Sequence, residues 1–295
     1  MCDSDLLYYS APGKINLYLK VTGKRPDNYH TIESIFLPLA EPADDIAIAC
    51  DALPGSILVG CSDVMLPGGT GNIAGRAAEL WAKKTNSVPH WDINIRKNIP
   101  VAGGMGGGSS DAAAVLNLLN RNSVAPLDAE ELKETALALG ADVPFFLNPR
   151  PALVTGIGEI CRDLEFAFPE LHILLAAPRF PVSAAEGYRL LAPEKISAAS
   201  DVLRQEIFSA LRQGDAEKLG KLIFNDLQDG VFAKYPILPL AADKIRASGA
   251  LSVLMTGSGP TLFALYPDRK SLAAAQAALS CELGNFRVSA AKIFA

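Results

Sequence analysis

The sequence predicts an α+β protein of two domains. Period-two and helical apolar patterns both recur along the chain. A glycine-rich segment lies between a predicted strand and a predicted helix, and the C-terminal part follows the order strand, turn, strand, helix, strand. The chain has 295 residues, 49% of them apolar, which is enough for two domains of ordinary size. We place the boundary near residue 160, giving domains 1–160 and 161–295.

Strand and helix patterns alternate in the first half of the chain. Apolar side chains at Ile15, Leu17, Leu19 and Val21 alternate with polar ones, which is typical of a half-buried strand. The same patterns predict further strands at 29–39, 45–50 and 91–97, and helices at 72–84, 110–119 and 127–139. Segment 140–146 interrupts the last of these helices and is expected to lead into extended chain.

The second half predicts another α+β layer. A strand at 172–177 precedes a helix-rich stretch at 184–248. The remaining pattern predicts strands at 251–255 and 261–266, a helix at 272–283 and a last strand at 287–294.

The glycine-rich segment between the strand at 91–97 and the helix at 110–119 is the most informative part of the chain. Glycine lets main-chain N–H groups turn inward and lets a ligand approach the backbone closely. A helix start adds unpaired N–H groups and a partial positive charge, which favour a phosphate. The segment therefore predicts a phosphate cradle, although glycine clusters also occur in flexible loops. Its residues are Pro100, Val101, Ala102, Gly103, Gly104, Met105, Gly106, Gly107, Gly108, Ser109 and Ser110.

Two common phosphate-binding patterns do not describe this loop. The Walker sequence occurs nowhere, and no lysine stands inside the loop. The dinucleotide fingerprint fails because its third glycine would fall on Ser109 or Asp111.

Composition excludes several classes of partner. The net charge is −5, with acids and bases mixed along the chain, so we expect no nucleic-acid partner. The N-terminal residues lack the pattern of a secretory signal, and no apolar run approaches the ~18 residues of a membrane span. The five cysteines and three histidines are scattered along the sequence. We therefore expect no disulfides and no metal site formed by protein side chains. We expect a cytoplasmic monomer or weak homodimer with no membrane partner.

Four polar or glycine-rich segments together resemble the GHMP kinases, the superfamily of galactokinase, homoserine kinase and mevalonate kinase. The segments are the glycine loop with 140–144, and residues 11–16, 27–30 and 255–260. The resemblance covers nearly the whole chain. It implies a two-domain GHMP kinase fold, with an N-terminal domain like ribosomal protein S5 domain 2 and a ferredoxin-like C-terminal α/β layer.

Segments 12–19, 22–30 and 139–144 narrow the resemblance within this family. They are similar to members that transfer the ATP γ-phosphoryl group, with Mg²⁺, to the 2-hydroxyl of a cytidine diphosphate-linked methylerythritol in the non-mevalonate isoprenoid (MEP) pathway. Two alternatives are another small-molecule kinase of the family, such as homoserine kinase, and a non-catalytic ligand-binding protein with this fold. The intact loop, Lys14 and Asp142 favour an enzyme.

The resemblance implies two catalytic residues. Asp142 would accept the proton of the substrate hydroxyl, and the charge of Lys14 would keep that carboxylate ionised and steady the developing alkoxide. The sequence alone favours a turn residue bonding nearby N–H groups at Asp142 and a solvated strand lysine at Lys14. The match to the family motif reverses this preference for Asp142.

The resemblance also implies a substrate-binding set, formed by Asn16, Tyr29, His30 and Tyr188. A tyrosine ring can stack on cytosine and an imidazole can bond to the base edge. Asn16 shares a strand face with Lys14, and would contact substrate unless it points outward. Tyr188 would close a sandwich around the base or belong to the core. Ala184, beside Ser183, stands where family members often have a hydroxyl, so the role of that hydroxyl is open.

Several neighbouring residues have two interpretations each. Ser109 and Ser110 would add hydroxyl groups to the cradle or only cap the helix. Lys97 could reach ATP, but a solvated strand end is favoured, and Asp111 would interact with the helix dipole. Segment 256–260 would be a hairpin turn or would also back the glycine loop.

Overall fold

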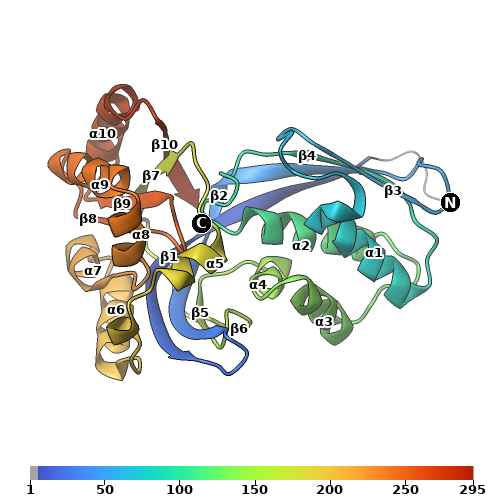
Figure 1. Cartoon of the computed structure of the whole chain (residues 1–295), viewed down its shortest axis with the longest axis horizontal. Helices are drawn as coiled ribbons and strands as arrows, with labels where there is room; N and C mark the ends of the chain where they lie inside the picture. Colours follow the sequence, from blue (N-terminus) through green and yellow to red (C-terminus); the bar gives the residue numbers. More distant parts are fainter. Residues whose placement is uncertain (1–5, 295) are drawn as a thin grey trace. The chain divides into compact units, whose positions relative to one another are not determined.

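The structure, a computed structural model, describes residues 6–294 and divides into two compact units (Figure 1). The first comprises 6–13, 42–101 and 106–149, and the second 14–41, 102–105 and 150–294. The units interleave along the chain because the strands β1 (Leu7–Lys24) and β2 (His30–Ala49) contribute to both. The consecutive sequence domains 1–160 and 161–295 stay a prediction.

The sheet of the first unit contains β3 (Ser56–Cys61), β4 (His90–Arg96) and the C-terminal end of β2, where residues 45–49 pair with β4. β3 runs parallel to β4, and β2 pairs with β4 in the antiparallel sense. Trp91, Ile93 and Ile95 of β4 are buried, as their alternation predicted. β3 was not predicted, since its side chains are only partly buried and carry a weak apolar pattern.

Helices of the first unit include one that follows the glycine loop directly. This helix, α2, begins three residues before the predicted start and is buried along most of its length. α3 begins after Asp128, whose side chain caps the helix by accepting from two N–H groups of the first turn. The bounds are η1 (Gly69–Gly71), α1 (Ile73–Thr85), α2 (Gly107–Arg121), α3 (Ala129–Leu139) and α4 (Val143–Leu147).

The short helix α4 was not predicted within segment 140–146, whereas the extended chain expected after that segment is present as strand β5 (Ala152–Thr155). Pro144 lies at its first positions, where the fixed φ of proline and its missing N–H suit a helix start. Phe145 and Phe146 are buried, so this turn is anchored by large apolar side chains. The turn places Asp142 at the N-cap position of α4.

The second unit contains an antiparallel sheet with the strand order β10–β7–β9–β8. Its predicted strands are confirmed to within a few residues. β9 is buried along its whole length, which identifies it as a central core strand. The bounds are β7 (His172–Pro178), β8 (Ser252–Met255), β9 (Leu262–Tyr266) and β10 (Phe286–Ile293).

Helices of the second unit fill the predicted helix-rich stretch and the region before the last strand (Figure 1). Leu238 and Ile245 of α9 and Leu279 of α10 join the same apolar core as the sheet. The bounds are α5 (Ala184–Arg189), η2 (Pro193–Lys195), α6 (Asp201–Gln213), α7 (Ala216–Leu222), α8 (Gln228–Lys234), α9 (Ile237–Ala247) and α10 (Arg269–Glu282).

Residues 14–19 of β1 are buried on both faces, so the prediction of a half-buried strand was wrong for this stretch, whereas the polar positions Lys20 and Thr22 are partly exposed as predicted. β1 pairs with β2, which also pairs with β5 (Ala152–Thr155), and β5 pairs with β6 (Ile160–Asp163). Asn16 and Tyr18 are each 2% exposed. Burial is tolerated because polar partners are present: the Tyr18 hydroxyl donates to Glu33 at 2.6 Å. β2 is one long strand where two were predicted.

Candidate active site

The glycine loop ends at the N-terminus of α2, in the first unit. The N-cap is Gly106, with a φ of 72° and no side-chain cap, and α2 continues through Gly107, Gly108, Ser109 and Ser110. Neither serine caps the helix. The first-turn N–H groups have no intrahelical acceptor, and the buried Ser110 hydroxyl has no hydrogen-bond partner among the described residues. Such an arrangement suits an anion.

The tip of the loop is held by close backbone contacts in the second unit. Gly104 has a φ of 77°, and a Cβ there would overlap the carbonyl oxygen of Thr256. The Gly103 carbonyl accepts from the N–H of Thr261 at 3.4 Å. Glycine is therefore required at position 104 both for conformation and for space.

The other loop residues take up different environments. Pro100 and Val101 lie at the loop start, where Val101 is 36% exposed. Ala102 has a φ of 49°, an uncommon value for a residue with a side chain. Met105 is buried, and its carbonyl accepts from the Lys14 N–H at 3.0 Å. The loop tip is thus tied to β1 within the second unit.

Lys14 is a buried lysine, 4% exposed, and not the solvated strand lysine of the alternative interpretation. Its Nζ donates to Oδ1 of Asn16 at 2.7 Å and lies 4.5 Å from the centroid of the Phe36 ring. The Asn16 amide donates to Oγ of Ser34 at 2.9 Å, and its N–H donates to Oγ1 of Thr256 at 3.0 Å. The predicted shared face of Lys14 and Asn16 is confirmed, and these contacts fix both side chains.

The segment 256–260 closes the β8–β9 hairpin and also backs the glycine loop, so both interpretations hold. A Cβ on Gly257 would stand 2.8 Å from the Gly104 carbonyl oxygen and 3.3 Å from Nζ of Lys14. Asn225, which the sequence analysis missed, donates to the Gly257 carbonyl at 2.8 Å. No motif identified Asn225, because it lies in an ordinary helix-to-helix connection far along the chain from this hairpin.

Asp142 lies in the first unit, partly buried, directly before α4. Its side chain does not cap α4. The turn is held by the main chain, where the Val143 N–H donates to the Gly140 carbonyl at 3.1 Å. Backbone bonds and the buried residues of α4 therefore set the position of the main chain at Asp142.

The predicted aromatic residues occupy two environments of the second unit. Tyr29 is 60% exposed in the turn between β1 and β2, and His30 begins β2. The His30 imidazole stacks on the Tyr188 ring of α5, with centroids 5.1 Å apart and planes at 10°. Burial, with a further effect of Lys24, lowers the pKa of His30, which favours the neutral form of the ring.

The stacked pair leaves no space for a base between His30 and Tyr188, because the rings are already at ordinary stacking distance. The exposed Tyr29 ring is the surface on which a base can stack without displacing a side chain. Ser183 has a structural role, since its hydroxyl accepts from the Glu186 N–H at 3.2 Å and caps α5. Ala184 is the first residue of α5.

A buried triad of Asp44, Lys97 and Asp111 lies in the first unit and was missed by the sequence analysis. Nζ of Lys97 donates to Oδ2 of Asp44 at 2.5 Å and to Oδ2 of Asp111 at 2.6 Å. The side chains are 0%, 7% and 3% exposed, in chain order. The prediction of Lys97 as a solvated strand end was therefore wrong, and Asp111 pairs with this lysine rather than acting through the helix dipole alone.

The pKa values of Asp111 and Lys97 are both raised. Burial raises the pKa of Asp111 to about 7, against the lowering effect of Lys97 and with a further rise from Asp44. Burial alone would lower the pKa of Lys97, but Asp111 and Asp44 raise it. The lysine thus stays charged, and Asp111 is the member that can carry a proton near neutral pH.

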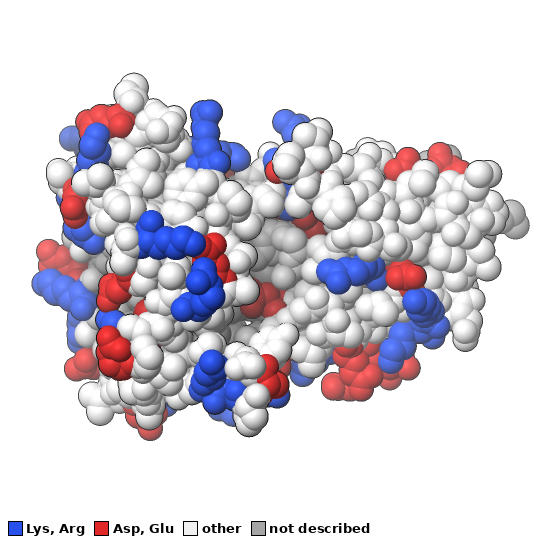
Figure 2. All heavy atoms as spheres, viewed as in Figure 1, with Lys and Arg blue, Asp and Glu red and all other residues white. Residues whose placement is uncertain are grey.

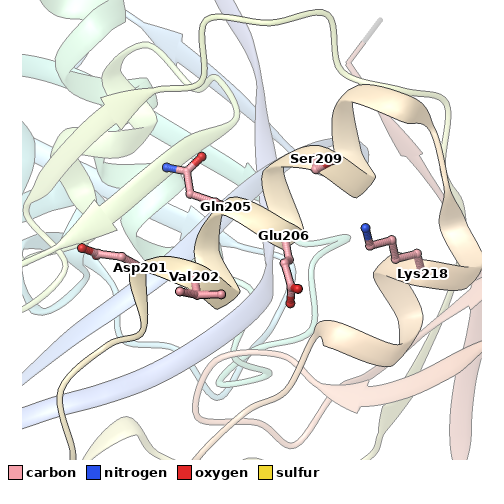
Figure 3. A pocket seen from close by; sticks show the side chains of 6 residues that line it. All are labelled: Asp201, Val202, Gln205, Glu206, Ser209 and Lys218. Carbon is pink, nitrogen blue, oxygen red and sulfur yellow. The ribbon is translucent and has the colours of Figure 1, made fainter.

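One shallow pocket of about 460 Å³ lies away from the predicted site residues (Figure 3). It is formed by α6 and α7, and its lining surface comes mostly from apolar atoms of side chains that carry polar or charged ends. The residues are Asp201, Val202, Gln205, Glu206, Ser209 and Lys218.

Charged side chains of both signs are intermixed on the face shown in Figure 2. Within residues 6–294, no three His, Cys, Asp or Glu side chains gather as a set of metal ligands. Over the same residues, no helix is long and apolar enough to cross a membrane.

Family models match both parts of the chain. The model for the GHMP kinases N-terminal domain matches residues 72–149, which include the glycine loop and Asp142, and the GHMP kinases C-terminal model matches residues 207–285. The chain belongs to the GHMP kinase family and has its two-domain fold. It is accordingly an ATP-dependent small-molecule kinase.

The similarity to curated relatives extends over almost the whole chain. A Geobacter sp. (strain M21) protein named 4-diphosphocytidyl-2-C-methyl-D-erythritol kinase is 38% identical over 94% of this chain and 95% of its own. A Clostridium perfringens protein of the same name is 36% identical over 95% of this chain and 94% of its own.

Two solved structures also match almost the whole chain. A 4-(cytidine 5'-diphospho)-2C-methyl-D-erythritol kinase matches with a TM-score of 0.79 and 32% identity over 97% of this chain and 98% of its own. A homoserine kinase from Cytophaga hutchinsonii matches with a TM-score of 0.75 at 15% identity, over 99% of this chain and 96% of its own. This second likeness shows the fold alone.

Proposed function

We propose that this chain transfers the γ-phosphoryl group of ATP to the 2-hydroxyl of 4-diphosphocytidyl-2-C-methyl-D-erythritol, releasing ADP and the 2-phosphate. The reaction belongs to the non-mevalonate isoprenoid (MEP) pathway. The observation that carries this proposal is the similarity, over more than nine-tenths of the chain, to relatives of that name. The exposed Tyr29 ring and the His30 imidazole, whose lowered pKa favours the neutral form, support a cytosine-containing acceptor.

The glycine loop is the proposed site of the ATP phosphates. Left-handed glycines, the uncapped start of α2 and the buried Ser110 hydroxyl offer donors without competing side chains. Mg²⁺ is proposed to enter with ATP, as part of the substrate, and to neutralise phosphate charge. Positioning and charge neutralisation then supply most of the catalysis, because the transition state of phosphoryl transfer is loose and highly charged.

Asp142 is the proposed proton acceptor. As the acceptor oxygen forms its bond to the γ-phosphorus, the bond from that phosphorus to the β,γ-bridging oxygen breaks and ADP leaves. The hydroxyl proton passes to the Asp142 carboxylate. The side chain of Asp142 does not cap α4, which is consistent with this role.

Lys14 is proposed to stabilise negative charge as it develops on the acceptor oxygen. A buried ammonium acts through a lower effective dielectric than water provides, so its field on a nearby oxyanion is strong. Asn16 holds this ammonium at 2.7 Å and is proposed to contact the substrate as well. Tyr29, His30 and Tyr188 are proposed to bind the cytidine, with Tyr29 as the stacking platform.

We further propose that the enzyme works in the cytoplasm on small molecules, as a monomer or weak homodimer, without nucleic-acid or membrane partners. The sequence domains 1–160 and 161–295 would carry the ATP loop and the closure of the substrate site, respectively.

Phosphorylation assays on purified protein test the acceptor. With ATP, Mg²⁺ and a panel of alcohols, the proposal expects ADP release and a new phosphomonoester on the cytidylyl methylerythritol only. Phosphorylation of homoserine instead would assign the chain to another branch of the family. Absence of transfer to any alcohol, with ATP still bound, would favour the non-catalytic alternative.

A further inference from the structure

The buried triad joins the two ends of the glycine loop. Lys97 follows β4 directly before the loop, and Asp111 lies in α2 directly after it. The hydrogen bond of 2.6 Å between them closes the base of segment 98–110. Asp44 of β2 binds the same ammonium at 2.5 Å, so a third element is fastened at this point.

Asp44 also holds the main chain that enters the loop. Its Oδ1 accepts from the N–H groups of Asn98 at 2.5 Å and Ile99 at 2.8 Å. Its Oδ2 lies 3.4 Å from the position that a Cβ on Gly107, the first residue of α2, would occupy. The carboxylate thus binds the segment that leads from β4 into the loop and lies close to the first residue of the helix that leads out of it.

Stability alone does not account for the triad. Removing three charged groups from water is unfavourable, and well-packed apolar side chains commonly stabilise a core as well or better. Charge-assisted hydrogen bonds are short and directional, so they fix geometry more strictly than apolar contacts do. A triad at the base of a glycine-rich loop therefore fixes the conformation of that loop more than it adds to the free energy of unfolding.

Two buried polar atoms at the start of α2 point to a ligand there. Among the described residues, Oγ of Ser110 and Oδ1 of Asp111 have no hydrogen-bond partner. Buried polar atoms are nearly always satisfied within a fold. The Ser110 hydroxyl can donate to an anion, beside first-turn N–H groups that have no intrahelical acceptor. Oδ1 of Asp111 is an acceptor when ionised and can bond to a phosphate only when its carboxyl is protonated.

We propose that Asp44, Lys97 and Asp111 are positioning residues for the ATP phosphates. By tying the strand before the loop to the helix after it, the triad holds the first-turn N–H groups of α2 in the arrangement that binds a triphosphate. The inference rests on the proposed function only in taking ATP as the ligand of this loop. It does not depend on the identity of the acceptor alcohol.

Two substitutions of Asp111 distinguish the hydrogen bond that closes the base of the loop from the negative charge of the side chain. Asp111→Leu and Asp111→Asn remove the same charge and leave the Lys97–Asp44 pair intact, but only asparagine can accept the hydrogen bond of Lys97. We expect Asp111→Leu to raise the KM for ATP, and the Kd of a non-hydrolysable ATP analogue, about tenfold, with a much smaller change in kcat at saturating ATP. Asp111→Asn should restore most of the affinity.

The controls make the result decisive. Thermal unfolding establishes that each variant is folded, and Asp111→Ala replaces the leucine variant if leucine does not fold. Analogue binding within about twofold of the parent in a folded leucine or alanine variant would overturn the proposal, as would equal weakening by asparagine. The analogue is titrated without the acceptor alcohol. The binding result can therefore be interpreted even if the proposed acceptor is wrong.

Discussion

At the scale of single residues, burial strengthens the electrostatic effect of a charged side chain in the predicted site. Lys14 is 4% exposed and is surrounded by an amide and an aromatic ring. In such an environment one charge changes the energy of a neighbouring oxyanion far more than it would in water. The roles proposed for Lys14 and Asp142 therefore depend on single functional groups, which can be tested one at a time.

Asp142→Asn should remove the proton acceptor and leave the phosphate cradle unchanged. We expect kcat to fall by about 10²–10⁴-fold while the Kd of a non-hydrolysable ATP analogue stays within about twofold. Steady-state kinetics and calorimetric titration provide the two numbers. Near-parental turnover would show that Asp142 is not the base.

Tyr29→Ala should weaken binding of the cytidylyl alcohol much more than binding of ATP. Stacking of one base on an aromatic ring is worth about 1–3 kcal/mol, so we expect the acceptor KM to rise about tenfold or more. Tyr8, also exposed at 68%, lies outside the predicted site, and Tyr8→Ala is the matched control. Equal increases of the KM for ATP and for the alcohol would contradict the role of Tyr29 as a platform.

Asp111→Asn should change the pH dependence of stability. The pKa of Asp111 is raised to about 7 in the fold, against about 3.9 in an unfolded chain. The native state therefore binds more protons between these values, and the contribution of Asp111 to stability is lost as pH rises from about 4 to 7.

The asparagine variant lacks this loss. Its Tm relative to the parent should therefore increase from pH 5 to about pH 7 and then level off toward pH 8, as measured by thermal unfolding in matched buffers. A constant Tm difference across this range would show that Asp111 does not titrate there.

At the scale of elements, the glycine loop depends on close backbone packing. Gly104→Ala should destabilise the protein, because residue 104 has a φ of 77° and its Cβ would overlap the Thr256 carbonyl. We expect a loss of about 2 kcal/mol or more in the free energy of unfolding. Gly108 is helical, and its Cβ would meet only Ile73 at 3.6 Å. Gly108→Ala should therefore retain or raise the Tm, and equal losses would argue against this packing.

Elements with a strong local signal were predictable and others were not. β4, the loop and α2 follow from the alternation of Trp91, Ile93 and Ile95 and from the glycine run. α4 was missed because five residues are too few to show helical periodicity. β3 was missed because its half-exposed residues have little apolar alternation.

At the scale of the whole molecule, the motifs could be predicted but their supporting contacts could not. Lys14 and Asp142 stand in recognisable segments. The triad depends instead on Asp44 meeting Lys97, a partner 53 positions along the chain, and neither residue lies in a motif. Asn225 likewise bonds across 32 positions to Gly257. Such partners are set by tertiary packing, which a local pattern does not encode.

A structure with a non-hydrolysable ATP analogue and the cytidylyl alcohol tests the central claim most directly. We predict that the triphosphate accepts hydrogen bonds from main-chain N–H groups between residues 103 and 110, and that the 2-hydroxyl donates to the Asp142 carboxylate while facing the terminal phosphorus. A triphosphate bound away from this loop, or an alcohol whose 2-hydroxyl lies outside hydrogen-bonding distance of Asp142, would contradict the account.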